Sequence, residues 1–346
     1  MIIKEKKIDM ANDIAIDLGT STVLVYLKGK GVVLAEPSVV VVEVNSGKVV
    51  KVGREAQQLL GRTPAGLCAV HPMKDGVIAH YDMTLQMIKY LLKKTVGQTF
   101  FKPRVLVCVP GGINEVEERA VCEATLRAGA KKAYLIEEPL AAAIGAGLDV
   151  SRPMGNMVVD IGGGTTDIAV ISLGNPVVSR SIKVAGNKID DAIIKYIRRK
   201  HNLLIGETAA EAIKVKYGSL VRTDENTSFE IRGRCLIEGL PKKAVLTVGE
   251  LVEAMDEPIA AIIDAICRVI ESTPPALVSD IASAGIVLTG GSAKLRGLPQ
   301  IIERVTGIKT VVAENPHMCV VEGTGRSLEN IPTIPEGVRN ISRSRG

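Results

Sequence analysis

The sequence predicts an α/β protein made of two related halves, and two stretches of strand–turn–strand pattern are the main reason. Residues 158–170 read as a strand that ends in Asp160, a turn of glycines and threonines, and a second strand. Residues 14–26 repeat this order around Asp17. The two aspartates lie about 140 positions apart, the length of a domain rather than of a solenoid repeat. We therefore expect a duplicated domain.

Both turns predict contacts with a phosphate chain and a bound Mg²⁺. Glycines let backbone N–H groups approach a ligand, while hydroxyls and carboxylates supply the oxygen ligands that Mg²⁺ prefers. A single glycine-rich turn between strands is more often only a turn. Two copies with matching Asp and Thr positions favour the binding interpretation.

The more familiar glycine motifs are excluded. A G-x-G-x-x-G motif that starts at Gly162 would need glycine at position 167, which is Asp167. A P-loop would need Gly-Lys-Ser/Thr, and the nearest match, which ends in Gly290-Gly291-Ser292, has no lysine. The sequence therefore favours neither a Rossmann dehydrogenase nor a P-loop NTPase.

Composition sets the broad class of protein. The chain has 346 residues, 46% of them hydrophobic, with 34 glycines and only 3% aromatic residues, so we expect two domains with aliphatic cores. The net charge of +5 permits attraction to an anionic membrane surface. No aromatic and basic stacking platform is evident. We therefore expect no nucleic acid partner.

The cysteines and histidines show no metal-ligand spacing. The six cysteines include no C-x-x-C pair and read as buried thiols of a reducing cytosol. The N-terminus has no apolar signal core, and no uncharged apolar run approaches the roughly 18 residues that a membrane span needs. We therefore expect a cytoplasmic protein.

The first half alternates strands and helices. After the first hairpin we expect strands between residues 32 and 52, a short helix over 54–60, a loop over 61–76 and a helix over 83–96. A buried strand at 105–109 precedes a helix capped by Asn114. After a strand at 133–136, the run Pro139-Leu140-Ala141-Ala142-Ala143 predicts a helix that packs very closely against another helix.

The second half follows the same plan. After the second hairpin, we expect a strand at 176–184, helices at 189–200 and 208–217, and a small strand insertion within 219–248. A long helix over 249–273 is predicted to end at Pro274-Pro275. A buried strand from Gly285 leads into the turn at Gly290-Gly291, and helices at about 297–305 and 318–329 follow.

Residues 97–103 contain two of the three phenylalanines of the chain, Phe100 and Phe101, beside Lys102. Two interpretations remain open from these residues alone. The rings either tuck into the core or form an exposed apolar tip that enters a membrane, with the basic neighbours on the lipid headgroups.

Several motifs together resemble the MreB/Mbl family of bacterial actins, within the actin/Hsp70/sugar-kinase ATPase superfamily. The resemblance spans about residues 12–330 and rests on Asp17-Leu18-Gly19-Thr20, Glu36-Pro37-Ser38, Ile136-Glu137-Glu138-Pro139-Leu140-Ala141-Ala142-Ala143-Ile144-Gly145, Asp160-Ile161-Gly162-Gly163-Gly164-Thr165-Thr166, Asn202-Leu203-Leu204-Ile205-Gly206-Glu207 and Thr289-Gly290-Gly291-Ser292. Asn187-Lys188 departs from it, since the family commonly has an acidic pair there.

The resemblance implies an actin-like ATPase fold of two RNase H-like domains, each with a small subdomain, and a nucleotide between them. It divides the chain into a tail (1–13), domain IA (14–37, 76–153 and 325–338), subdomain IB (38–75), domain IIA (154–186 and 254–324), subdomain IIB (187–253) and a basic C-terminal tail (339–346).

It also implies roles for particular residues in an ATP- and Mg²⁺-dependent site. Asp17 and Asp160 would hold Mg²⁺ through water. Glu138 would orient the attacking water, with Glu137 as the weaker alternative and Thr165 beside it. The nucleotide would contact Gly19, Thr20, Ser21, Thr22, Gly162, Gly163, Gly164, Thr165, Thr166, Gly186, Glu211, Lys214, Gly290, Gly291 and Ser292. The alternative for Glu138 is a carboxylate that only favours the helix dipole.

The function implied is an ATP-dependent polymer with slow ATP hydrolysis, which lies on the inner face of the cytoplasmic membrane and organises the cell-wall elongation machinery of rod-shaped cells. The loop with Phe100 and Phe101 would then insert into the membrane. Three alternatives remain: a soluble Hsp70-like ATPase, which lacks a substrate-binding domain here; a sugar kinase, for which no base motif is found; and a scaffold that does not hydrolyse ATP.

Overall fold

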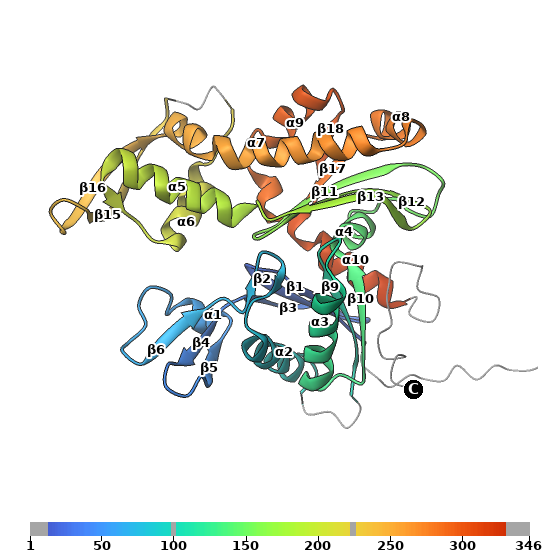
Figure 1. Ribbon diagram of the computed structural model, residues 1–346, viewed down its shortest axis with the longest axis horizontal. Coiled ribbons are helices and arrows are strands. Elements are labelled where there is room, and N and C mark those ends of the chain that lie inside the picture. The colour runs from blue at the N-terminus through green and yellow to red at the C-terminus, as the bar shows by residue number, and fades with distance from the viewer. Residues whose placement is uncertain (1–12, 98–101, 222–225, 330–346) are drawn as a thin grey trace, which may run out of the picture.

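The computed structural model describes residues 13–97, 102–221 and 226–329. Its two halves are stacked one above the other, and each is built around a five-stranded mixed sheet (Figure 1). The first sheet has the order β10-β9-β1-β2-β3, and the second has the order β13-β12-β11-β17-β18. The α/β fold class predicted from the sequence is confirmed.

The two sheets share one topology. In the first, β1 (Ile14–Leu18), β2 (Thr22–Leu27) and β3 (Gly31–Pro37) form an antiparallel meander, and β9 (Arg104–Val109) and β10 (Lys132–Glu137) add in parallel beside β1. In the second, β11 (Asn156–Ile161), β12 (Thr166–Ser172) and β13 (Asn175–Ile182) form the meander, and β17 (Ile286–Thr289) and β18 (Thr310–Val312) add in parallel beside β11. The predicted duplication is therefore a duplication of the whole sheet.

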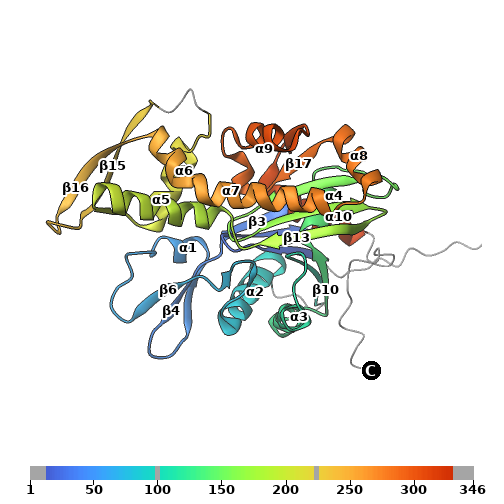
Figure 2. The same cartoon turned by 45° about the horizontal axis from the view of Figure 1, so that its top comes forward.

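Each half carries a small three-stranded sheet, and both small sheets lie on the same side of the molecule (Figures 1 and 2). The first consists of β4 (Val40–Glu43), β5 (Val49–Val52) and β6 (Leu67–Val70), with the short helix α1 (Arg54–Gln57). The second consists of β14 (Leu203–Leu204), β15 (Ser228–Cys235) and β16 (Pro241–Thr247). A two-stranded ribbon, β7 (Met73–Lys74) and β8 (Val77–Ile78), follows β6. Strands β6 and β7 lie where the sequence predicted only a loop.

Helices cover the sheets. The first half contains α2 (Tyr81–Val96) and α3 (Glu115–Ala128), whose N-cap is the predicted Asn114 in a capping box with Glu117. The second half contains α5 (Gly186–His201), α6 (Glu207–Tyr217), α7 (Val248–Ser272), α8 (Pro275–Ala284) and α9 (Leu298–Thr306). Helix α8 was not predicted, because Pro274-Pro275 was interpreted only as the end of α7, although Pro275 also suits the first turn of a new helix.

Two helices join the halves. Helix α4 (Glu138–Gly145) and helix α10 (Cys319–Ser327) contribute Leu140, Ala142 and Val320 to one buried cluster, together with residues of both main sheets. Their backbones touch: a Cβ built at Gly323 would lie 1.8 Å from the carbonyl oxygen of Ala141. The predicted close helix packing of the small-residue segment is confirmed, and α10 is its partner.

No helix within the described ranges combines the length and the apolar character needed to cross a membrane.

Candidate functional site

A cavity of about 360 Å³ lies between the halves, where the turn of β1 and β2 faces the turn of β11 and β12. Most of the residues that the sequence analysis selected line this one cavity. They are Asp17, Gly19, Thr20, Ser21, Thr22, Glu138, Asp160, Gly162, Gly163, Gly164, Thr165, Gly186, Glu211, Lys214, Gly290, Gly291 and Ser292.

The two turns are in direct contact. A Cβ built at Gly164 would lie 2.3 Å from Oγ1 of Thr20 and 2.8 Å from its Cβ, and one at Gly163 would lie 2.0 Å from Oγ of Ser21. Any side chain at these glycines would force the turns apart. Here glycine is required by the close approach of two chain segments, which leaves backbone N–H groups from both sides available to one ligand.

Two aspartates occupy matching places on the two halves. Asp160, at the end of β11, is buried and accepts a hydrogen bond of 2.6 Å from Oγ1 of Thr289. Burial raises the pKa of Asp160 to about 7. Asp17, at the end of β1, keeps some exposed surface, but its carboxyl group is desolvated. This desolvation raises the pKa of Asp17 to about 6, although the hydrogen bond from Cys108 acts to lower it. Both carboxylates are therefore costly to keep charged without a cation.

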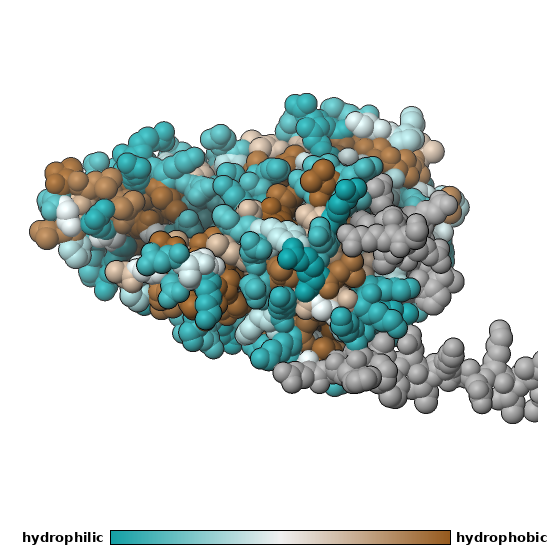
Figure 3. All heavy atoms as spheres, turned by 60° about the horizontal axis from the view of Figure 1, so that its bottom comes forward, coloured by the Kyte–Doolittle hydropathy of each residue, from teal (hydrophilic) through white to brown (hydrophobic). Residues whose placement is uncertain are grey.

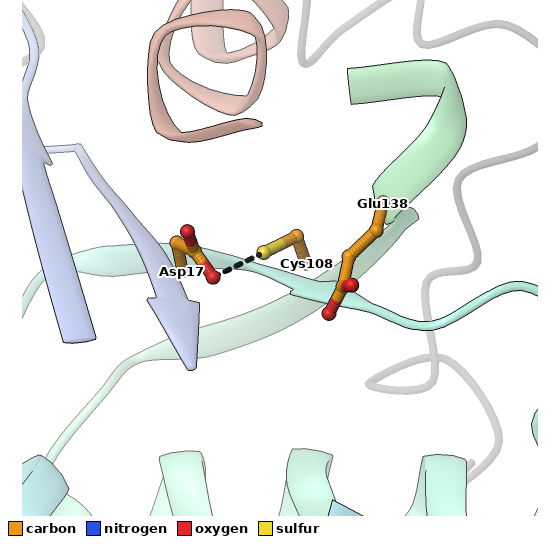
Figure 4. Close-up of side chains that lie close together, drawn as sticks. All are labelled: Asp17, Cys108 and Glu138. Atoms are coloured by element: carbon orange, nitrogen blue, oxygen red, sulfur yellow. Dashed lines mark hydrogen bonds between the residues drawn. The ribbon is translucent and has the colours of Figure 1, made fainter. Parts of the chain in front are cut away.

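Glu138 is the first residue of α4 and is 8% exposed. Burial, and then the negative charges of Asp167, Asp17 and Asp160, raise its pKa well above the usual range. Figure 4 shows Glu138 beside Cys108, whose thiol donates a hydrogen bond of 3.4 Å to Oδ1 of Asp17. Ligand atoms of these three residues lie within 4.8 Å of one another.

This acidic end of the cavity fits a divalent cation. Asp17 and Asp160 belong to facing halves, carry raised pKa values and offer the hard oxygen atoms that Mg²⁺ prefers. A cation between them would offset the desolvation of both carboxylates. Carboxylates of this kind bind Mg²⁺ with several of its waters retained.

The other end of the cavity is formed by α5, α6 and the turn after β17. Nζ of Lys214 donates to the carbonyl oxygen of Gly186 at 2.9 Å, and Oγ of Ser292 donates to the carbonyl oxygen of Gly162 at 2.8 Å. Gly290 has φ +85° and lies so close to Ile161 that a Cβ would meet its carbonyl oxygen at 2.3 Å. The glycine turn therefore lets the two chain segments come together.

Two selected residues do not line the cavity. Thr166 is fully buried on the other side of β12 and donates to the carbonyl oxygen of Val184 at 2.7 Å. Side chains alternate along a strand, so Thr165 and Thr166 cannot both face the ligand. Glu137 is the residue before α4, and it is not among the residues that line the cavity, whereas Glu138 is. Phe100 and Phe101 lie outside the described residues.

The cavity also contains residues that the sequence analysis did not select: Leu24, Gly76, Asn187, Val215, Lys294, Pro316, His317 and Val320. Asn187 accepts a hydrogen bond of 3.0 Å from Ser21, and the N–H of Gly76 donates one of 3.0 Å to Thr20. No local motif marks these positions, except that Asn187 follows Gly186 in a predicted turn. Their places depend on how distant segments fold together.

Two matched five-stranded sheets with a cavity between their glycine turns are typical of the class of actin-like proteins. Solved structures support this assignment. MreB 5 of Spiroplasma citri bound to AMPPNP superimposes with a TM-score of 0.89 at 37% identity, over 94% of this chain and 98% of that one. The MamK double helical filament, at 22% identity, shares the fold with a TM-score of 0.77, over 92% of this chain and 99% of that one.

Sequence comparison gives the family. The model of the MreB/Mbl protein family matches residues 11–336, so the chain belongs to the MreB/Mbl family. It is 49% identical to the cell shape-determining protein Mbl of Bacillus subtilis (strain 168), over 94% of this chain and 98% of that protein. It is also 49% identical to the cell shape-determining protein MreB of Escherichia coli (strain K12), over 93% of this chain and 94% of that protein. The resemblance seen in the sequence is confirmed.

Proposed function

We propose that this protein is an ATP-binding bacterial actin that assembles into membrane-associated filaments, organises cell-wall synthesis and maintains rod shape. The observation that carries the proposal is the pair of touching turns with Asp17 and Asp160 beside them. Relatives named cell shape-determining proteins, and solved structures of MreB5 bound to AMPPNP and to ADP, support it.

The proposed binding mode follows the two ends of the cavity. The turns with Thr20, Ser21 and Thr22 on one side and Gly162 to Thr165 on the other contact the β- and γ-phosphates through hydroxyl and N–H groups. Asp17 and Asp160 would hold Mg²⁺ through water, and the bound cation would offset the charge that develops on the phosphate oxygens. Lys214, Glu211 and the turn Gly290-Gly291-Ser292 surround the nucleoside.

Glu138 is the proposed catalytic residue for hydrolysis of ATP to ADP and phosphate. It is buried next to the phosphate-facing turns and lies at the acidic end of the cavity. In its ionised form, the carboxylate accepts a hydrogen bond from a water molecule, orients it toward the γ-phosphate and receives its proton. Thr165, which lines the same part of the cavity, is the proposed second contact to that water.

Filament formation gains support from an exposed apolar tip. Leu236, Ile237 and Leu240, in the turn between β15 and β16, are 41–77% exposed, and apolar side chains gather at this end of the molecule (Figure 3). Contiguous apolar surface of this kind favours association with another macromolecule. We propose self-association as the main use of exposed apolar surface on this chain.

The remaining parts of the proposal concern the membrane and the domains. Attachment to the inner face of the cytoplasmic membrane would use Phe100 and Phe101, with help from the basic tail at 339–346 through anionic lipids. The proposed partners are further copies of the chain, this membrane surface and the proteins of the cell-wall elongation machinery. The domain boundaries given in the sequence analysis stay part of this proposal.

Phosphate release tests the enzymatic part of the proposal. Purified protein with Mg²⁺ and ATP should release phosphate slowly, and Glu138→Gln should release much less while it binds ATP with unchanged affinity. Binding of ATP without any release by the wild-type protein would instead identify a scaffold that does not hydrolyse ATP.

A further inference from the structure

Lys214 stands out because a second, buried residue fixes its position in the cavity. Its side chain, on α6, is 13% exposed, and Nζ forms an ion pair of 2.8 Å with Oδ2 of Asp190, whose side chain is 11% exposed. Asp190 lies on α5 and does not line the cavity itself. Neither local motif nor the family resemblance selected Asp190 in the sequence analysis.

The hydrogen bonds of Lys214 leave one donor for a ligand. An ammonium group carries three N–H donors. Two are used, by Oδ2 of Asp190 at 2.8 Å and by the carbonyl oxygen of Gly186 at 2.9 Å. Among the described residues, no third acceptor is bonded to this nitrogen. Because Lys214 lines the cavity, its third N–H is available to an acceptor placed there.

Gly186 makes this geometry possible. A Cβ at Gly186 would lie 2.6 Å from Oγ of Ser292 and 3.3 Å from Nζ of Lys214. A side chain would therefore occupy the space through which the lysine reaches the start of α5. The ammonium group is held from two directions, by the backbone of residue 186 and by the carboxylate one turn further along the same helix.

Charge indicates which part of a nucleotide this donor meets. Asp190 neutralises Lys214, and the nearby carboxylate of Glu211 adds a further negative charge. Oδ1 of Asp190 is buried and has no hydrogen-bond partner among the described residues. The surroundings of Lys214 are thus poorly suited to phosphate groups, whereas the N–H groups and hydroxyls of the two turns are well suited to them. A neutral acceptor, such as a ribose hydroxyl or a purine ring nitrogen, fits the remaining donor.

We propose that Asp190 is a positioning residue, which holds Lys214 so that its third N–H donates to an acceptor on the nucleoside of the bound nucleotide. This inference rests on the proposed function, because it assumes that a nucleotide occupies the cavity. It assigns to the ion pair a role in recognising the nucleoside and none in binding the phosphates.

The test compares a ligand that has a nucleoside with one that lacks it. Affinities for ATP and for inorganic tripolyphosphate, both with Mg²⁺, are measured by calorimetry for the wild-type protein, Asp190→Ala, Asp190→Asn and Asp191→Ala. Asp190→Ala should weaken ATP binding roughly tenfold, the effect of losing one hydrogen bond to a charged group, and leave tripolyphosphate binding unchanged. Asp190→Asn, which keeps an oxygen acceptor, should retain most of the affinity. The control Asp191→Ala, at the neighbouring, partly exposed residue, should change neither affinity.

Lys214→Met keeps the proposal testable if Asp190→Ala does not fold. Lys214→Met should show the same selective loss of ATP affinity, and adding Asp190→Ala to it should cause no further loss. The 2′-deoxy and 3′-deoxy forms of ATP then separate a ribose acceptor from a base acceptor. If Lys214 donates to a ribose hydroxyl, the analogue that lacks this hydroxyl should bind the wild-type protein and Lys214→Met with equal affinity. If Lys214 donates to the base, both analogues should bind Lys214→Met more weakly than the wild-type protein.

Other outcomes contradict the inference. Equal losses for ATP and tripolyphosphate would show that Asp190 only maintains the fold, and unchanged ATP affinity in both Asp190→Ala and Lys214→Met would remove the contact altogether. Failure of the wild-type protein to bind ATP would instead refute the proposed function, which keeps the two failures distinct.

Discussion

The hydroxyl of Ser21 donates a hydrogen bond of 3.0 Å to Oδ1 of Asn187, which joins the turn of the first hairpin to the start of α5 in the other half. The two halves are therefore in contact beside the cavity that both of them line. The neighbouring glycines, Gly163 and Gly164, fit against Ser21 and Thr20 with no space for a side chain. Nucleotide affinity should depend on this close approach.

Gly164→Ala should weaken binding of Mg²⁺ and ATP about tenfold or more. The new methyl group would meet both Oγ1 and Cβ of Thr20, so the turns must separate, and such over-packing typically costs 1–3 kcal/mol. Calorimetric titration measures the effect. Gly206→Ala is the matched control, because Gly206 does not line the cavity and has no heavy atom within 4 Å of its Cβ position. Equal affinities of the two variants would contradict the account.

Glu138→Gln should leave nucleotide affinity within about twofold and slow phosphate release by roughly 10²–10⁴-fold, the usual size of a general-base contribution. The amide keeps the shape of the side chain but cannot accept the proton of the attacking water. Single-turnover phosphate release measures the chemical step. A release rate equal to that of the wild-type protein would move the catalytic role to another residue.

The affinity for Mg²⁺ and ATP should fall as the pH is lowered from 8 to 6. Asp17 and Asp160 have pKa values of about 6 and about 7, both raised by burial, so the two carboxylates take up protons over this range. Only their ionised forms attract the cation, and cation binding therefore releases protons. Asp160→Asn should bind Mg²⁺ and ATP more weakly at pH 8, and its affinity should change less with pH than that of the wild-type protein. The titration of ATP itself affects both proteins equally, so it cancels in the comparison. Parallel pH profiles would show that Asp160 does not take part.

Gly323→Ala should lower the stability of the protein and leave its contacts with the nucleotide unchanged. Its methyl group would collide with the backbone of Ala141, where α10 crosses α4, and both helices belong to the core that joins the halves. We expect a loss of about 1–3 kcal/mol in the free energy of unfolding, measured by urea denaturation. Gly291→Ala is the control for stability, because no heavy atom lies within 4 Å of its Cβ position, and it should unfold like the wild-type protein.

The sequence was sufficient for features that depend on neighbouring residues. The hairpins around Asp17 and Asp160, the cap at Asn114 and the close-packing segment Leu140–Ala143 were all predicted, because each is determined by the order of residues within one short stretch. The pairing of the two hairpins was inferred from their similarity. The family resemblance then supplied Lys214, Glu211 and the turn at Gly290, which no local pattern connects to the hairpins.

Features that depend on distant segments could not be predicted. Asn187, Gly76 and Asp190 meet Ser21, Thr20 and Lys214 only when segments distant in the sequence fold together, and only Asn187 lies in a predicted turn. Thr166 is a different case: strand alternation places it opposite Thr165, so its exclusion from the cavity was available from the pattern. Helix α8 was missed because a proline pair was taken only as a stop signal.

The most direct test of the central claim is co-sedimentation with anionic liposomes, with and without Mg²⁺ and ATP, followed by electron microscopy of the pellet. The account predicts filaments on the lipid surface when nucleotide is present, and their loss in Gly164→Ala. Dispersed protein that stays in the supernatant with Mg²⁺ and ATP, at concentrations where nucleotide is bound, would contradict a membrane-associated polymer and leave a soluble ATPase of the same fold.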